Sequence, residues 1–96
     1  MRHFVFMKFE PGYFDTGVFE YIRQTFARLQ SVLPEDVLSC RVSRNCVERE
    51  RNMDLMIEME LKGRESLDLY LNHPLHIAIG ERMNSHVVNI ASFDCE

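Results

Sequence analysis

Hydrophobic and polar patterning predicts four strands, at residues 2–10, 37–46, 53–62 and 87–95. The first of these stretches is apolar on both faces, because Phe4 and Phe6 point one way while Val5 and Met7 point the other. A strand of this kind belongs in the middle of a sheet that has something covering each side.

The second and third predicted strands are each apolar on one face. In the second, Leu38, Cys40 and Val42 alternate with polar residues, which predicts a half-buried strand. The third alternates most cleanly, with polar and mostly acidic residues on its other face apart from Met56. Its apolar face consists of Met53, Leu55, Ile57, Met59 and Leu61.

Helical spacing of apolar residues predicts three helices between the strands. The first begins at Asp15 or Thr16, either of which suits an N-cap, and it ends before Pro34. Its apolar stripe is Val18, Ile22, Phe26, Leu29 and Leu33. A short helix is expected at residues 64–71. Pro74 suits the first position of a helix, so a third helix is expected from there to about residue 85.

The order strand, helix, strand, strand, helix, strand is the split arrangement of the ferredoxin-like fold. We therefore predict a single α+β domain over residues 1–96, with a ferredoxin-like βαββαβ antiparallel sheet and helices on one face. The other face stays open and carries either Phe4 and Phe6 or Val5 and Met7, depending on the register. An open apolar face usually marks a partner site, so we expect a homodimer that forms through the sheet.

Charge and cysteine content narrow the partners and the location. The 96 residues carry a net charge of -4 without a basic block, so neither a nucleic acid nor a membrane surface is expected as a partner. The third strand also lacks the aromatic residues on which RNA-binding modules stack bases. No targeting or membrane-spanning segment is expected. Cys40, Cys46 and Cys95 match no zinc or redox spacing, which favours free thiols in the reducing cytoplasm.

Three segments resemble the stress-responsive A/B-barrel (Dabb) family. Arg2–Phe9, followed by Pro11 and Gly12, is similar to the family's first strand, and residues 69–76 resemble its motif of a tyrosine followed by His-Pro-x-His. The closing pair Phe93-Asp94 is typical of the family as well. The resemblance implies a dimeric α/β-barrel in which two subunits pair through their sheets, with a small pocket between sheet and helices. It also implies a role in stress tolerance or, as in some plant members, in polyketide cyclisation.

The resemblance to one family member, olivetolic acid cyclase, implies candidate catalytic residues. Its tyrosine and two of its histidines match Tyr70, His76 and His3, which implies that His76 acts as base and Tyr70 as acid or orienting group, with no cofactor. This sequence departs from the cyclase at Leu55, where the cyclase has a histidine. The alternative interpretation is structural: His76 forms a hydrogen bond near the helix start, and Tyr70 buries its ring with its hydroxyl satisfied.

The predicted ligand-binding residues are His3, Val5, Met7, Tyr70, His73 and His76. His3 either lines the pocket or is a satisfied core histidine. His73 and His76 are three residues apart, so a metal site completed by His3, Asp94 or a glutamate is an alternative. The competing interpretation is that His73 caps the helix or faces solvent, and we predict no metal site.

Three functions follow from these patterns. We favour a small stress-associated homodimer that binds an apolar or carbonyl-bearing ligand without turnover. The alternative is a cofactor-independent enzyme of the polyketide cyclase, isomerase or monooxygenase type, which uses His76 and Tyr70. A structural assembly protein is the third, and it predicts oligomers beyond the dimer and no ligand.

Overall fold

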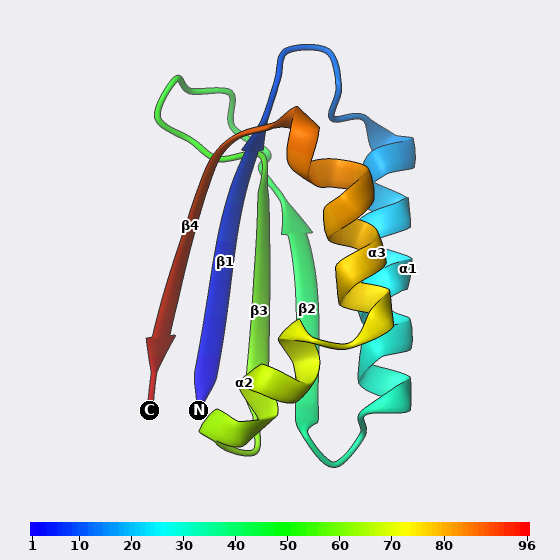
Figure 1. Cartoon of the computed structure of the whole chain (residues 1–96). Helices are drawn as coiled ribbons and strands as arrows, with labels where there is room; N and C mark the ends of the chain where they lie inside the picture. The colour runs from blue at the N-terminus through cyan, green and yellow to red at the C-terminus, as the bar shows by residue number, and fades with distance from the viewer.

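The predicted order of strands and helices is present in the computed structural model, which describes residues 1–96 (Figure 1). Four strands form one antiparallel sheet, and the helices lie against one of its faces. The elements in chain order are β1 (Arg2–Phe9), α1 (Thr16–Val32), β2 (Val37–Arg44), β3 (Leu55–Leu61), α2 (Arg64–Leu71), α3 (Pro74–Met83), a 3₁₀ turn (Asn84–His86) and β4 (Val87–Cys95). The ferredoxin-like α+β prediction is therefore confirmed. No helix combines the length and the apolar character that crossing a bilayer requires.

The sheet order β2-β3-β1-β4 places β1 in the interior of the sheet, as its two apolar faces predict. His3 of β1 lies opposite Met59 of β3 and Asp94 of β4. Met59 belongs to the buried core under the helices, so His3 faces the helices as well. Val5 and Met7 point to the same side of the strand as His3. Phe4 and Phe6 therefore lie on the open face, which decides between the two registers that the sequence allowed.

A local capping signal and an apolar stripe define helix α1. The Asp15 side chain accepts a hydrogen bond from the Val18 N–H at 2.8 Å, which satisfies one of the free donors at the helix start. Ile22, Phe26 and Leu29 of the predicted stripe are buried against the sheet. This packing holds the helix on the strands.

Helices α2 and α3 are separated at the predicted break. His73 is the N-cap of α3, and its Nδ1 accepts a hydrogen bond from the Leu75 N–H at 3.1 Å. Pro74 then takes the first helical position, where its missing N–H costs nothing. The predicted capping role of His73 is confirmed. Helix α3 ends at Met83, two residues before the expected end, and continues as the 3₁₀ turn.

The predicted inward face of β2 is wrong at Leu38, whose exposed fraction is 52%. The pairing of β2 with β3 shifts register between Val37 and Ser39, so one residue of β2 is extra at this point. The extra residue inverts the alternation. Val37 is buried instead, while Cys40 and Val42 keep the predicted side.

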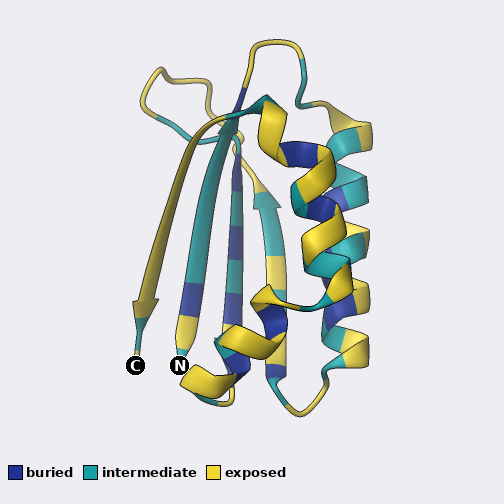
Figure 2. Ribbon diagram, viewed as in Figure 1, coloured by how far each residue is buried: buried dark blue, intermediate teal, exposed yellow.

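The buried core lies between the helices and the strands β1, β2 and β3 (Figure 2). All four strongly apolar positions of β3 within the strand are buried, as their alternation predicts: Leu55, Ile57, Met59 and Leu61. By contrast β4, at the edge of the sheet, is exposed along most of its length. The helix layer thus stops short of one edge of the sheet, and this offset shapes the site described next.

Candidate functional site

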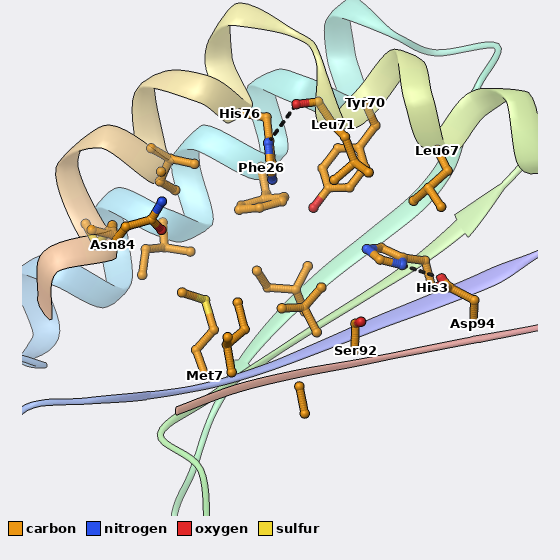
Figure 3. A pocket seen from close by; sticks show the side chains of 18 residues that line it. His3, Met7, Phe26, Leu67, Tyr70, Leu71, His76, Asn84, Ser92 and Asp94 are labelled. Atoms are coloured by element: carbon orange, nitrogen blue, oxygen red, sulfur yellow. Dashed lines mark hydrogen bonds and ion pairs between the residues drawn. The ribbon is translucent and has the colours of Figure 1, made fainter. Parts of the chain in front are cut away.

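A cavity of about 420 Å³ lies between the helix-facing side of β1 and β4 and the helices. Its wall is formed by 18 residues, of which 12 are hydrophobic, and Figure 3 shows their side chains. The cavity exists because the helices leave β4 uncovered, so that Ile90 and Ser92 are exposed although they face the helix side. Its size lies within the usual range of small-molecule sites, about 300–1,000 Å³.

His3 carries an unpartnered nitrogen in this cavity. The side chain is only 4% exposed, and its Nδ1–H donates to Oδ1 of Asp94 at 2.5 Å. The two residues face each other across β1 and β4, so the strand register positions the pair. His3 Nε2 is buried without a hydrogen-bond partner. With Nδ1 donating to the carboxylate, Nε2 of the neutral ring is a hydrogen-bond acceptor.

Tyr70 of α2 lies between two histidine rings. Its ring centroid is 5.5 Å from that of His3 and 4.7 Å from that of His76, with edge-on geometry in both cases. Burial raises the pKa of the Tyr70 hydroxyl well above its usual value, and the nearby Cys40 and Asp94 raise it further. The hydroxyl therefore stays protonated, and Figure 3 shows it turned into the cavity with no hydrogen bond drawn to it.

His76, at the start of α3, is held by the end of α2. Its Nδ1–H donates to the Leu71 carbonyl oxygen at 3.0 Å, which satisfies one of the free acceptors at the end of that helix. Burial lowers the pKa of the His76 ring, and the neighbouring His3 lowers it further, although the bond to Leu71 acts in the opposite direction. The ring is therefore neutral at pH 7, and its Nε2 is an acceptor.

The structure brings together most of the residues that the sequence singled out. His3, Val5, Met7, Tyr70 and His76 all line the cavity. The residue left outside is His73, because its ring is occupied with capping α3. The metal alternative that joined His73 to His76 loses its basis, and no cluster of three or more His, Cys, Asp and Glu side chains is arranged to hold a metal ion.

Sequence reasoning did not assign three polar residues of the wall to the pocket: Asp94, Ser92 and Asn84. Asp94 was considered only as part of a closing motif and as a possible metal ligand. The signal that could have found it is the alternation in β4, which places Ile90, Ser92 and Asp94 on one face.

The polar groups of the cavity form a hydrogen-bonding set in an apolar wall. The protonated Tyr70 hydroxyl is a donor, while Nε2 of His3 and of His76 are acceptors. Asp94 fixes the tautomer and the orientation of the His3 ring, which is how a carboxylate positions an imidazole to act as a base. The arrangement can hold a carbonyl oxygen beside a hydroxyl or an acidic C–H.

The whole chain, residues 1–96, matches the family model described as the Stress responsive A/B Barrel Domain. No curated protein matches the sequence.

Solved structures resemble the fold at low sequence identity. A dimeric ferredoxin-like protein of unknown function from Thermobifida fusca has a TM-score of 0.78 at 16% identity, covering 96% of this chain and 85% of that one. A protein from Arabidopsis thaliana also has a TM-score of 0.78, at 13% identity, covering 99% and 92%. The hydroxynitrile lyase from Passiflora edulis has a TM-score of 0.75 at 12% identity, covering 96% and 87%. At such identities the likeness concerns the fold alone.

Proposed function

The chain belongs to the stress-responsive A/B-barrel family, and on that premise we propose that it is a homodimer that binds a small, largely apolar ligand bearing a carbonyl group. The observation that carries the proposal is the buried Nε2 of His3, an acceptor without a hydrogen-bond partner, beside the Tyr70 hydroxyl that Figure 3 shows turned into the cavity. A buried polar group without a partner costs about 1–3 kcal/mol, and a ligand that supplies the partner removes that cost.

A methyl ketone tests the binding proposal because it combines one carbonyl with an apolar chain. We expect 2-nonanone to shift backbone amide NMR signals of β1, β4 and α3 in the wild-type protein. Tyr70→Phe removes only the hydroxyl, so the dissociation constant should rise about two- to tenfold through the loss of one hydrogen bond. Tyr21→Phe is the matched control, because Tyr21 lies outside the cavity wall. Equal affinity in wild type and Tyr70→Phe would contradict the role of the hydroxyl, and a ketone that does not bind would contradict the ligand class.

A second function, a cofactor-independent enzyme, is favoured by the pairing of His3 with Asp94. An oriented imidazole beside a protonated phenol can move a proton next to a carbonyl group. A C–H bond beside the carbonyl breaks, its proton goes to Nε2 of His3 or of His76, and the enolate oxygen accepts a hydrogen bond from Tyr70. Return of the proton to another atom of the enolate completes an isomerisation. In a cyclisation the enolate carbon instead attacks a second carbonyl carbon of the same ligand, the C=O π bond breaks, and the proton passes to the alkoxide oxygen that forms, so neither reaction needs a redox partner. The hydroxynitrile lyase of Passiflora edulis shows that this fold accommodates an enzyme.

Hydrogen exchange separates binding from this chemistry. In heavy water, an enzyme of this type would accelerate deuterium incorporation beside the carbonyl of 2-nonanone, measured by mass spectrometry. His3→Ala and His76→Ala, each verified to be folded and of unchanged oligomeric state, then identify which ring is the base. Exchange at the rate of buffer alone, with the ketone bound, would exclude this activity and leave the binding function.

The homodimer is proposed through the open face of the sheet. Phe4 and Phe93 lie side by side there, with ring centroids 6.4 Å apart, and Phe93 is 61% exposed. An apolar face of this kind is stabilised by a second copy, and the Thermobifida fusca neighbour is described as dimeric. Phe93→Lys should shift the mass measured by light scattering from dimer to monomer. Ile77→Lys, on an exposed position of α3, is the matched control and should leave the mass unchanged.

We place the protein in the cytoplasm, without a nucleic acid or membrane partner. The support for the location is that Cys40, Cys46 and Cys95 are all free thiols. The charge distribution argues against a nucleic acid or membrane partner, because Glu58 and Glu60 lie on the open face and the net charge is -4.

A further inference from the structure

One face of helix α3 lines the cavity from end to end. The α3-face residues are His76, Ile79, Gly80, Met83 and Asn84, the last being the C-cap residue. Their spacing of three and four positions keeps them on one side of the helix. The two ends of this row are polar and its middle is not. His76 and Asn84 are eight residues apart, which is about 12 Å along a helix.

The sheet wall is polar at one end only. Along β4 the cavity residues run from Asp94 through Ser92 to Ile90, and the opposite positions of β1 run from His3 to Met7. The sheet wall is thus polar at the His3 end and apolar towards the other end, so the far end of the cavity has its polar group on the helix side. Figure 3 shows Asn84 across the apolar side chains from His3, so its amide is the polar group of the far end.

Asn84 is free to contact a ligand. Its backbone N–H is bonded to the Gly80 carbonyl oxygen, and its backbone is helical, so the helix does not need the side-chain amide. The amide lies over Gly80, where an added Cβ would sit 3.3 Å from Nδ2. Because Gly80 has no side chain, nothing from α3 separates this amide from the cavity.

From these positions we infer that the ligand is polar at both ends: a carbonyl head at His3 and Tyr70, an apolar body, and a distal hydroxyl or amide bound by Asn84. The inference rests on the proposed binding function and specifies its ligand class. An amide side chain is both donor and acceptor, so Asn84 can pair with a hydroxyl or an amide, each of which is also both.

A pair of probes that differ in one hydroxyl tests the inference. Dissociation constants of 2-nonanone and 9-hydroxy-2-nonanone are measured by calorimetry for the wild type, for Asn84→Leu and for the control Gln24→Leu on an exposed position of α1. We expect the terminal hydroxyl to tighten binding about two- to tenfold in the wild type and in Gln24→Leu. In Asn84→Leu this gain should disappear, while 2-nonanone binds at least as tightly as before.

The outcomes distinguish this inference from the function on which it rests. If 2-nonanone binds in the cavity but the hydroxyl brings no gain, or brings the same gain in Asn84→Leu, the role of Asn84 is overturned and the binding function stands. If neither probe binds the wild type, the carbonyl ligand class is wrong, and the two-ended ligand is wrong with it.

Discussion

Replacing Gly80 should stabilise the protein, although the residue lies in the wall of the proposed site. Gly80 sits inside helix α3, where glycine is an unfavourable helix former, and its backbone is in an ordinary conformation that any residue adopts. A Cβ added there meets only the Asn84 side chain, with Nδ2 at 3.3 Å. That contact is tight, but Asn84 is exposed and its side chain can move by a few tenths of an ångström.

The magnitude follows from two opposing terms. Alanine is favoured over glycine in a helix interior by about 0.8–1.0 kcal/mol. Moving the Asn84 side chain costs a few tenths of that, because it makes no hydrogen bond that would break. The net gain for Gly80→Ala is then about 0.5–0.8 kcal/mol, which corresponds to about 2–6 °C in Tm for a domain of this size.

Urea unfolding followed by circular dichroism measures this gain, at one fixed protein concentration because dimer formation would couple to folding. Gly12→Ala is the matched control with the opposite expectation. Gly12 has open space around its Cβ position but a φ of +83°, so alanine should destabilise by about 1–2 kcal/mol. A loss of stability in Gly80→Ala, or a change equal to that of Gly12→Ala, would refute the reasoning.

The same position links stability to function. Gly80→Leu adds a strong helix former whose side chain reaches into the apolar part of the cavity. We expect stability at least equal to that of the wild type and weakened binding of 2-nonanone, since the two compete for the same space. A stabilised variant that binds the ketone unchanged would show that the ligand does not occupy the cavity beside α3.

Three further predictions concern other parts of the chain. Leu29→Ala removes a core side chain with 0% exposure and should cost about 2–5 kcal/mol in urea unfolding, whereas Val32→Ala on an exposed position of the same helix should cost under about 0.5 kcal/mol. The pKa of His76 is lowered in the folded state, so the unfolded chain binds the proton first. The free energy of unfolding should therefore fall as the pH drops below 6.5, and it should fall less steeply in His76→Gln than in the wild type. Equal pH slopes in the two proteins would contradict the lowered pKa of His76. Burial raises the pKa of the Cys40 thiol to about 11, so iodoacetamide should modify exposed Cys46 much faster at pH 8, as peptide mass spectrometry would show.

The fold was predictable because its signals are local and agree with one another. The stripe of α1, the Pro74 start of α3 and the alternation of β3 each specify one element, and their order then restricts the topology. The error at Leu38 arose where no local signal exists. A bulge changes the register of β2 through its pairing with β3, and the residues of β2 alone do not reveal it.

The site was predictable only in part, because it depends on which segments become neighbours. The motif around Tyr70 and His76 is local, and both residues line the cavity. The pairing of His3 with Asp94 joins residues 91 positions apart, and it depends on β4 lying next to β1. Alternation shows which face each side chain takes but not the register of β4 on β1, so the carboxylate partner of His3 could not be assigned.

The cavity itself results from a property of the whole fold rather than of any one residue. The helix layer leaves β4 uncovered, and Gly80 contributes no side chain to the wall, so the space beside β1 stays open. Filling it with apolar side chains would bury more surface, and an apolar residue in place of His3 would remove the cost of the unpartnered Nε2. Packing alone therefore does not account for an open cavity with an oriented imidazole at one end. The proposed ligand would account for it, because its apolar body would fill the space and its carbonyl head would contact Tyr70 and the region of His3.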